Sequence, residues 1–375
     1  MPDPNAPVRF TPSVETIAPD ETETIAELIE TLQTIGRKTH EDYRRGMRTV
    51  HAKCHGLLRG ELRVYAGLAP ELAQGLFAMP ATYPVVMRSS TSPGDPIHDS
   101  VSLPRGLALK VIGVDGERFQ IGTPGRTQDF VMANGPTFPK GDPKAFLRNL
   151  KLLAATTDRA EGAKKALSAT LRGTEQALEA VGGESATLKA MGGHPQTHPL
   201  GETYFSQAAL RHGDYIAKYA LRPASPALAA LTDTPMDERG HENALREAVQ
   251  AFFSGHEAEW ELCVQLCTDP EAMPVEDTTK EWDASVSPFR PVASVRVPRQ
   301  QVWVDGVSEA IDQRLAFNPW HVLRVHQPLG AIMRARREVY RAMSAFRAGQ
   351  NGVQIVEPST RESLDALFEA AAAAR

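Results

Sequence analysis

A succession of short strand-like segments with no helix between them constrains this fold most. Five segments rich in apolar, β-branched and aromatic residues, separated by Gly, Pro and Asp turns, are expected at 61–66, 83–90, 106–114, 117–123 and 129–134. Short turns can join only antiparallel strands, because a parallel pair needs a long crossover. Further strands are expected at 204–210, 215–221, 260–267 and 293–297. Strands and helices that do not strictly alternate predict an α+β protein built on an antiparallel barrel or sandwich.

Helical periodicity flanks these strands on both sides. Apolar residues recur at helical spacing from Asp20 to about Arg45, and residues 307–348 are also mostly helical in pattern. An Ala-rich stretch at about 143–190 predicts a helical insert. We therefore expect an N-terminal arm at 1–18, a main domain at 19–348 and a C-terminal tail helix at 349–375.

The charge balance argues against several classes of partner. The 375 residues carry 41 basic and 46 acidic side chains, and the net charge of -5 gives no electrostatic reason to bind nucleic acid. No apolar run approaches the roughly 18 residues of a membrane span. The first ten residues lack the pattern of a secretory signal, and three cysteines are too few for a disulfide framework. We expect a cytoplasmic protein.

A histidine and an arginine near strand ends are the first candidates for chemistry. His51 lies between small residues shortly before a strand. It is either a general base, since an ordinary pKa of about 6.5 suits proton transfer, or a core histidine bonded to the backbone. Arg88 lies near the end of a strand, as either a clamp for an anion or a surface charge. The residues alone leave both choices open.

One helical face near the C-terminus carries an unusual set of side chains. Steps of four and seven place Arg336, Tyr340 and Arg347 on one face of the helix expected after Pro328. A guanidinium one turn from a phenol favours the phenolate, which is a hard anionic ligand for ferric iron. The alternative is an amphipathic helix whose arginines extend to solvent.

Four segments, taken together and in this order, resemble motifs of the haem-containing catalase superfamily. They are Arg48-x-x-His51-Ala-Lys, similar to the distal histidine motif; Arg88-x-Ser90, similar to the Arg-Phe-Ser strand; Leu103-Pro-Arg-Gly-Leu-Ala-Leu-Lys110, similar to Asp-Pro-Arg-Gly-Phe-Ala-Val-Lys; and Arg336-x-x-x-Tyr340, similar to the proximal helix. The match spans residues 40–348. It implies a catalase-like antiparallel eight-stranded β-barrel with surrounding and C-terminal helices, and haem b between barrel and helices.

The resemblance also assigns roles to the matched residues. Tyr340 would be the axial ligand of the iron, and Arg336 would keep it as phenolate. His51 would move the proton of the bound peroxide, while Ser90 would fix its ring. The remaining haem contacts implied by the family are Arg48, Arg88 and Arg347 on the propionates, Val50 above the iron, and Phe130 and Phe138 beside the ring.

The sequence departs from the family at the distal asparagine that polarises the peroxide. In a gap-free alignment Arg126 stands at this position, and it either supplies a cationic donor or is replaced in that role by Gln128 or Asn134. Only 28 residues follow Arg347, so the chain resembles the small catalase-related peroxidases and allene oxide synthases more than full-length catalases. A homodimer is expected rather than the interlocked tetramer.

The implied function is that of a haem-dependent peroxidase. It would reduce hydrogen peroxide or organic hydroperoxides through a ferryl intermediate, with an organic reductant. Fast dismutation of hydrogen peroxide is not expected without a substitute for the distal asparagine. The sequence leaves open a fatty-acid hydroperoxide isomerase or dehydratase of the allene oxide synthase type, an oxygenase-type activity, and a haem-binding module without enzymatic activity.

Overall fold

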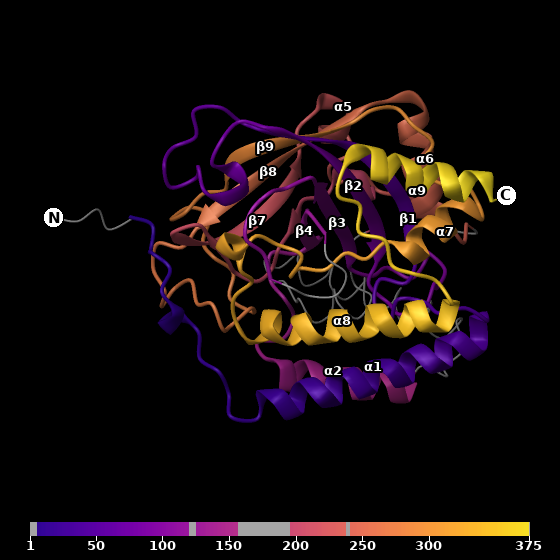
Figure 1. Cartoon of the computed structure of the whole chain (residues 1–375), viewed down its shortest axis with the longest axis horizontal. Helices are drawn as coiled ribbons and strands as arrows, with labels where there is room; N and C mark the ends of the chain where they lie inside the picture. Colours follow the sequence, from indigo (N-terminus) through magenta and orange to yellow (C-terminus); the bar gives the residue numbers. More distant parts are fainter. Residues whose placement is uncertain (1–5, 120–124, 157–195, 238–240, 375) are drawn as a thin grey trace.

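An antiparallel β-barrel lies at the centre of the computed structural model, which describes residues 6–119, 125–156, 196–237 and 241–374. Its strands are β1 (Cys54–Val64), β2 (Thr82–Thr91), β3 (Arg105–Ile112), β4 (Thr127–Ala133), β5 (Tyr204–Phe205), β6 (Leu210–His212), β7 (Tyr215–Pro223), β8 (Ala258–Leu266) and β9 (Arg290–Val297). Neighbours follow the order β5-β4-β3-β2-β1-β9-β8-β7, and pairing of β5 with β7 closes the ring. The short β6 pairs with the same strand β7. The predicted α+β class and eight-stranded antiparallel barrel are confirmed (Figure 1).

Four of the five strand segments expected between residues 61 and 134 lie largely within β1 to β4. The fifth, at 117–123, is not a strand where the structure describes it, and the prediction is wrong for 117–119. Arg118 forms a single bridge with Leu323, which belongs to no strand and so offers no paired edge to extend. Residues 120–124 lie outside the described residues.

Alternating side chains give the barrel an apolar interior and a partly charged exterior. Met87 and Leu109 belong to the interior core, whereas the adjacent Arg88 and Lys110 lie on the outside. These outward charges are nevertheless buried, with Arg88 only 3% exposed and Lys110 0% exposed. Buried charges need partners, because leaving water without one is costly. The outer face of β2 and β3 must therefore be covered by other segments that carry acids.

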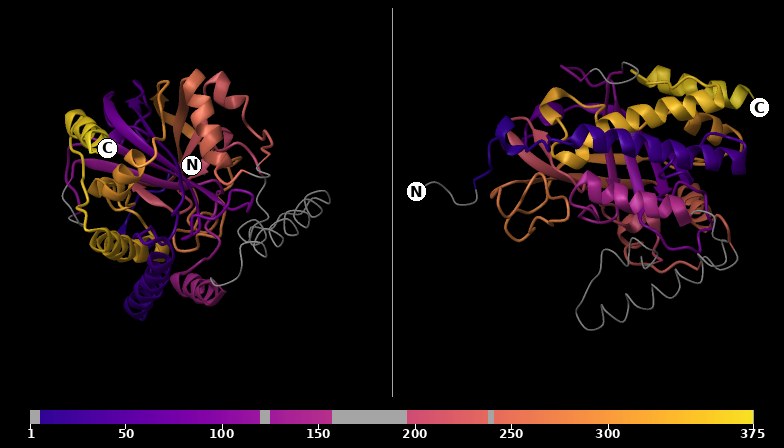
Figure 2. Two further views of the ribbon diagram at one scale, coloured as in Figure 1. Left: turned by 90° about the vertical axis from the view of Figure 1, so that its right-hand side faces the viewer. Right: turned by 90° about the horizontal axis from the view of Figure 1, so that it is seen from below.

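Helices supply part of this cover, while Lys110 pairs with Asp129 of β4 and with Glu357, which lies outside the helices. The helices are α1 (Glu21–Tyr43), α2 (Pro143–Thr156), α5 (Pro226–Ala229), α6 (Ala244–Gly255), α7 (Val307–Arg314), α8 (Ala331–Asn351) and α9 (Arg361–Ala373). Figure 2 shows α1, α2 and α8 running alongside one another, and apolar residues such as Leu28, Leu32 and Ala335 join them in one cluster. Helices α7 and α9 instead pack on Leu57 and Val86 of the barrel wall. No helix within the described ranges is long and apolar enough to cross a membrane.

The two ends of the chain are built in different ways. Residues 6–18 of the arm pack against the body, where Val8 N donates to Cys267 O at 2.8 Å and Phe10 N donates to Asp214 O at 2.7 Å. The C-terminal helix continues to Asn351 and then ends, because Gly352 adopts the left-handed conformation (φ 61°). The tail helix begins only at Arg361. Of the expected insert, α2 is described and residues 157–195 lie outside the described residues.

A chain of hydrogen bonds crosses the apolar core of the barrel. Leu76 N donates to His326 Nε2 at 2.9 Å, so His326 carries its proton on Nδ1, 3.1 Å from the Tyr219 hydroxyl. His212 Nε2 donates to Leu72 O at 3.1 Å, so its Nδ1 accepts from Tyr219, 2.8 Å away. Each imidazole is thus held neutral with a defined tautomer. Burial lowers the pKa of His212 to about 4 and that of His326 to about 3.

These buried histidines make the fold sensitive to acid. Their native pKa values lie below the ordinary value, so the stability that they contribute is fully present above about pH 6.5 and falls as the pH drops towards 4. The loss is about 1.4 kcal/mol per pH unit for each group. We expect the free energy of unfolding in urea to be lower at pH 5 than at pH 7.5. In His326→Gln the pH slope should be shallower, whereas exposed His256→Gln should leave it unchanged; an equal slope in His326→Gln contradicts the assignment.

Candidate functional site

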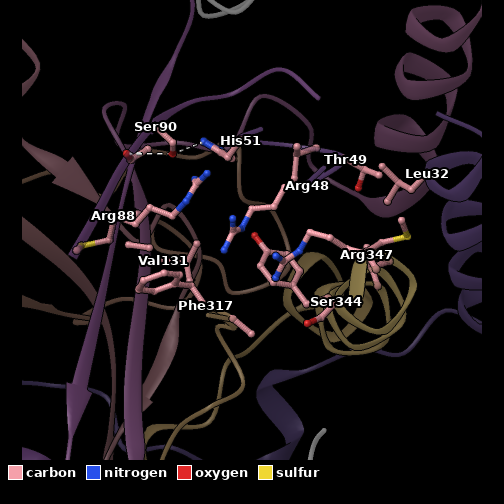
Figure 3. Close-up of a pocket in the computed structure, with 18 of the residues that line it drawn as sticks. Leu32, Arg48, Thr49, His51, Arg88, Ser90, Val131, Phe317, Ser344 and Arg347 are labelled. Carbon is pink, nitrogen blue, oxygen red and sulfur yellow. Dashed lines mark hydrogen bonds between the residues drawn. The ribbon is translucent and has the colours of Figure 1, made fainter. Parts of the chain in front are cut away.

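A pocket of about 780 Å³, including its open mouth, lies between the outer face of the barrel and helices α1 and α8. Its walls come from the segment just before β1, from β2, β3 and β4, and from α8 (Figure 3). Most of the predicted site residues line it together: Arg48, Val50, His51, Arg88, Ser90, Tyr340 and Arg347. Residues up to 300 positions apart in the sequence therefore share one cavity.

His51 is held by its backbone in an unusual conformation. Its φ of 55° lies in the left-handed region, which costs a non-glycine residue roughly 1–2 kcal/mol. Two backbone bonds maintain it, since His51 N donates to Ser92 O and Ala52 N donates to Pro93 O, both at 2.9 Å. The loop after β2 thus fixes where this imidazole enters the pocket.

The hydrogen bonds of His51 also define its tautomer. Ser90 Oγ donates its only proton to Gly106 O at 3.4 Å, so the His51 Nδ1 atom, 3.1 Å away, must donate to Ser90 Oγ (Figure 3). The Nε2 atom is then free to accept a proton. Burial, helped by the positive charges of Arg88 and Arg336, lowers the pKa of His51 to about 3. The ring is therefore neutral at pH 7 and able to act as a base.

Gly106 provides the room for this ring. A Cβ atom at Gly106 would lie 2.5 Å from His51 Cε1 and 2.6 Å from its Nδ1. A real Cβ essentially never makes such contacts, so a side chain at this position would displace the imidazole. The glycine in the Leu103–Lys110 motif is thus part of the support of His51.

Tyr340 lies on the helical wall of the pocket. Helix α8 begins after Gly330, whose φ of 87° suits glycine, and extends for 21 residues. Four residues before Tyr340, one turn earlier, Arg336 donates from Nη2 to the Tyr340 hydroxyl oxygen at 2.8 Å. The guanidinium carbon of Arg336 lies 5.0 Å from the centre of the Tyr340 ring. The Tyr340 oxygen is thus an acceptor beside a fixed positive charge.

Three guanidinium groups meet at one end of the pocket, where two of them pair with a carboxylate that sequence reasoning missed and the third bonds to the end of the helix that carries this carboxylate. Asp312, in α7, lies 2.8 Å from Arg48 Nη1 and 2.7 Å from Arg88 Nε. Arg347 Nη2 donates to Leu315 O at 3.0 Å, just beyond the C-terminal end of the same helix. Figure 3 shows the side chains of Arg48, Arg88 and Arg347 extending towards one another from different segments. We call Arg48, Arg88, Arg347 and Asp312 the arginine cluster.

The arginine cluster carries more positive than negative charge. Three cations share one carboxylate, which leaves a surplus of two positive charges in a buried place. Burial and the neighbouring Arg88 lower the pKa of Arg48 to about 10, and burial with Arg48 lowers that of Arg347 to about 9. Burial alone would raise the pKa of Asp312, but Arg48 and Arg88 hold it well below its usual range. Such a cluster suits an anionic ligand.

The structure does not bring the other predicted residues to the pocket. Arg126 is half exposed and pairs with Asp115 at 2.5 Å. Phe130 points into the barrel core, where its ring centre lies 5.1 Å from that of Tyr219, because Val131 takes the outward position on β4. Phe138 stacks on Phe146 of α2 at 5.4 Å.

Neither alternative donor lines the pocket. Gln128 Oε1 accepts from Leu323 N at 2.9 Å, and its Nε2 is buried with no acceptor among the described residues. Asn134 Nδ2 donates to Glu202 Oε2, so it is occupied away from the pocket. The pocket is instead lined by apolar residues, of which only Leu107 and Ala108 belong to one of the four motifs: Leu32, Leu107, Ala108, Val131, Met132, Ala316, Phe317, Val339 and Met343.

Solved structures resemble this one in fold. A fungal catalase and catalase A from Saccharomyces cerevisiae both match with a TM-score of 0.58 and 17% identity, over 85% and 83% of this chain. A bacterial catalase matches with a TM-score of 0.56 and 20% identity over 93% of this chain. The chain has the catalase fold. The matches cover 65%, 63% and 65% of those three catalases, which is less than two thirds of their length.

The catalase fold was the expectation drawn from the four motifs, and it is confirmed. No family model matches the sequence, and no curated protein is detectably similar to it. The roles of individual residues in this catalase-like chain stay predictions, because likeness at this level of identity establishes the fold alone.

Removing the shared carboxylate should destabilise the chain. In Asp312→Asn the buried Arg88 and the partly buried Arg48 lose their carboxylate partner, and we expect a loss of about 3–5 kcal/mol in the free energy of unfolding. Urea titration measures it. The matched control is Asp365→Asn, which breaks the exposed pair with Arg59 and should cost about 1 kcal/mol or less. Equal effects of the two variants would show that the arginine cluster does not depend on Asp312.

Proposed function

We propose that this chain is a haem-dependent peroxidase that reduces hydroperoxides with an external electron donor. One observation carries the proposal: a neutral imidazole with a free proton-accepting nitrogen and a tyrosine oxygen beside a guanidinium line the same pocket. An oxygen ligand for ferric haem and a positioned base are the protein groups that hydroperoxide cleavage requires. The catalase fold supports the same conclusion.

The donor set fits haem b. The two propionates of haem b carry two negative charges, which equal the surplus of the arginine cluster. Nε of Arg48, Nη1 of Arg88 and Nε of Arg347 have no acceptor in the described part of the chain, so they are available to an anion. The largely apolar lining suits the faces of a porphyrin. Tyr340 would supply the axial oxygen, and the arginine cluster would bind the propionates.

Haem bound in this way supplies the redox chemistry of O–O bond cleavage. His51 Nε2 takes the proton from the terminal hydroperoxide oxygen and gives it to the other oxygen, which leaves as an alcohol, or as water from hydrogen peroxide. Ser90 and Gly106 keep the ring in the tautomer that this transfer needs. Arg336 donates a hydrogen bond to the Tyr340 oxygen and would hold that oxygen in place as the axial ligand.

The lining of the pocket favours organic hydroperoxides over hydrogen peroxide. The described lining contains no Asn or Gln, so the leaving oxygen lacks an amide donor of a kind worth about 2.7–4 kcal/mol in oxyanion holes. Apolar side chains such as Leu32, Val131 and Phe317 can instead contact the organic group.

The same lining supports a second candidate function, the rearrangement of a fatty-acid hydroperoxide. An alcohol with oxidised donor indicates the peroxidase, and an epoxide indicates the rearrangement.

Haem ligation is tested by absorption spectroscopy. The purified chain reconstituted with haem should give a Soret band and high-spin ferric bands, and Tyr340→Phe should lose or shift them because it lacks the ligating oxygen. Tyr83→Phe, a half-buried tyrosine of β2 outside the pocket lining, is the matched control and should keep the spectrum. A wild-type chain that takes up no haem, or an unchanged spectrum in Tyr340→Phe, contradicts the proposal.

Proton transfer is tested at His51. His51→Gln should keep the Soret band yet reduce the rate of hydroperoxide cleavage by about 10²–10⁴-fold, the usual contribution of a positioned acid–base group. Stopped-flow decay of cumene hydroperoxide measures this rate, with exposed His256→Gln as the control. A wild type that binds haem but is inert towards every hydroperoxide would instead favour the haem-binding module.

The expected homodimer and the expected cytoplasmic location stay predictions. Sedimentation of the purified chain measures its oligomeric state.

A further inference from the structure

A second pocket lies on the far side of the arginine cluster. It has a volume of about 490 Å³, including its opening, and shares Arg48 and Arg347 with the first pocket, while Asp312 lines the second pocket alone. Arg88 lines only the first pocket, and Arg246 lines only the second. The same guanidinium groups thus form the wall between the two cavities.

The second pocket carries surplus positive charge. Its lining contains five cationic side chains and two carboxylates. One of the cations, Lys53, is neutralised by Asp99 at 2.7 Å. Arg45 and Arg246 have no carboxylate within ion-pair distance in the part of the chain that the structure describes. These two arginines without an acidic partner are separate from the arginine cluster that would bind the propionates, and they make this cavity a place where an anion is stabilised.

Arg246 is held ready for such a ligand. Its Nε and Nη2 atoms donate to Cys54 O at 3.3 and 3.0 Å, and its guanidinium carbon lies 3.9 Å from the centre of the Trp303 ring. These contacts fix the plane of the guanidinium while Nη1 has no acceptor among the described residues. A fixed guanidinium loses little conformational entropy when it binds an anion. Apolar atoms of Met47, Pro96 and Trp303 also line the cavity, and these suit an organic body.

We propose that the second pocket binds a small organic anion and, resting on the proposed function, that this anion is the electron donor. A donor held there lies behind the haem propionates, outside the space that the hydroperoxide needs beside His51. Two molecules of an enediol monoanion each give up one electron and one proton. Together these reduce one hydroperoxide to one alcohol and one water, so electrons and protons balance.

Direct binding to the full chain without haem tests the site. Isothermal titration with ascorbate at pH 7 should give saturable binding with one site per chain. Arg246→Gln and, separately, exposed Arg45→Gln should weaken this binding by about tenfold or more, because each loses a cationic donor. The matched control is Arg211→Gln, since Arg211 also donates to a backbone carbonyl (Gly213 O, 2.6 Å) and lies over a ring, that of Phe10. It should bind ascorbate like the wild type.

The outcomes separate this site from the haem proposal. No saturable binding, equal affinity in Arg246→Gln and Arg45→Gln, or equally tight binding of inorganic phosphate overturns the organic-anion site, whatever the haem spectrum shows. Arginine-dependent ascorbate binding by a chain that never takes up haem keeps the anion site and overturns its role as the donor site. In the haem-loaded chain, Arg246→Gln should keep the Soret band while the KM for ascorbate rises.

Discussion

One buried carboxylate joins the barrel, the helices and the candidate site. Asp312 bonds to Arg88 from β2 and Arg48 from the segment before β1, while the end of its own helix receives Arg347 from α8. Three guanidiniums would repel one another in a dry interior, so their approach depends on this charge and on the carbonyl groups at the C-terminal end of α7, where the helix dipole is negative. The shape of the pocket follows from that arrangement, because the same side chains set the distance between barrel wall and α8.

The sequence predicted those parts of the site that depend on local spacing. Arg336 and Tyr340 meet because residues four apart on a helix are neighbours, and this can be read without knowing the fold. Asp312 could not be found in this way, since its partners are up to 264 residues away and nothing in its own segment marks it. The predicted haem contact of Phe130 is wrong because its side chain lies on the core face of β4. Side chains alternate along a strand, so an aromatic residue chosen because it lies in the expected segment can face the barrel core and not the pocket.

The two walls of the pocket are built in different ways. Tyr340 is positioned by a regular helix whose ends are fixed by Gly330 and Gly352, so its placement is mostly a local property. His51 depends on a left-handed backbone, on the loop after β2, and on the space left by Gly106. Substitutions far along the chain can therefore disturb the imidazole more easily than the phenol. Periodicity predicted the individual strands and helices, and the resemblance of four motifs predicted the barrel. Neither could indicate the support of His51, because that support is tertiary.

The closure of the barrel has a consequence for how the molecule fluctuates. β5 contains two residues, and it contributes one paired position to β4 and two to β7, whereas β1 and β2 pair over nine. The ring is thus fastened at this seam by very few hydrogen bonds, and transient parting of the wall costs least there. Amide hydrogens of β5 would exchange with solvent long before those of β1 and β2, which bear His51's supports and Arg88. Transient opening of the barrel is therefore expected at β5, away from β1 and β2 beside the candidate site.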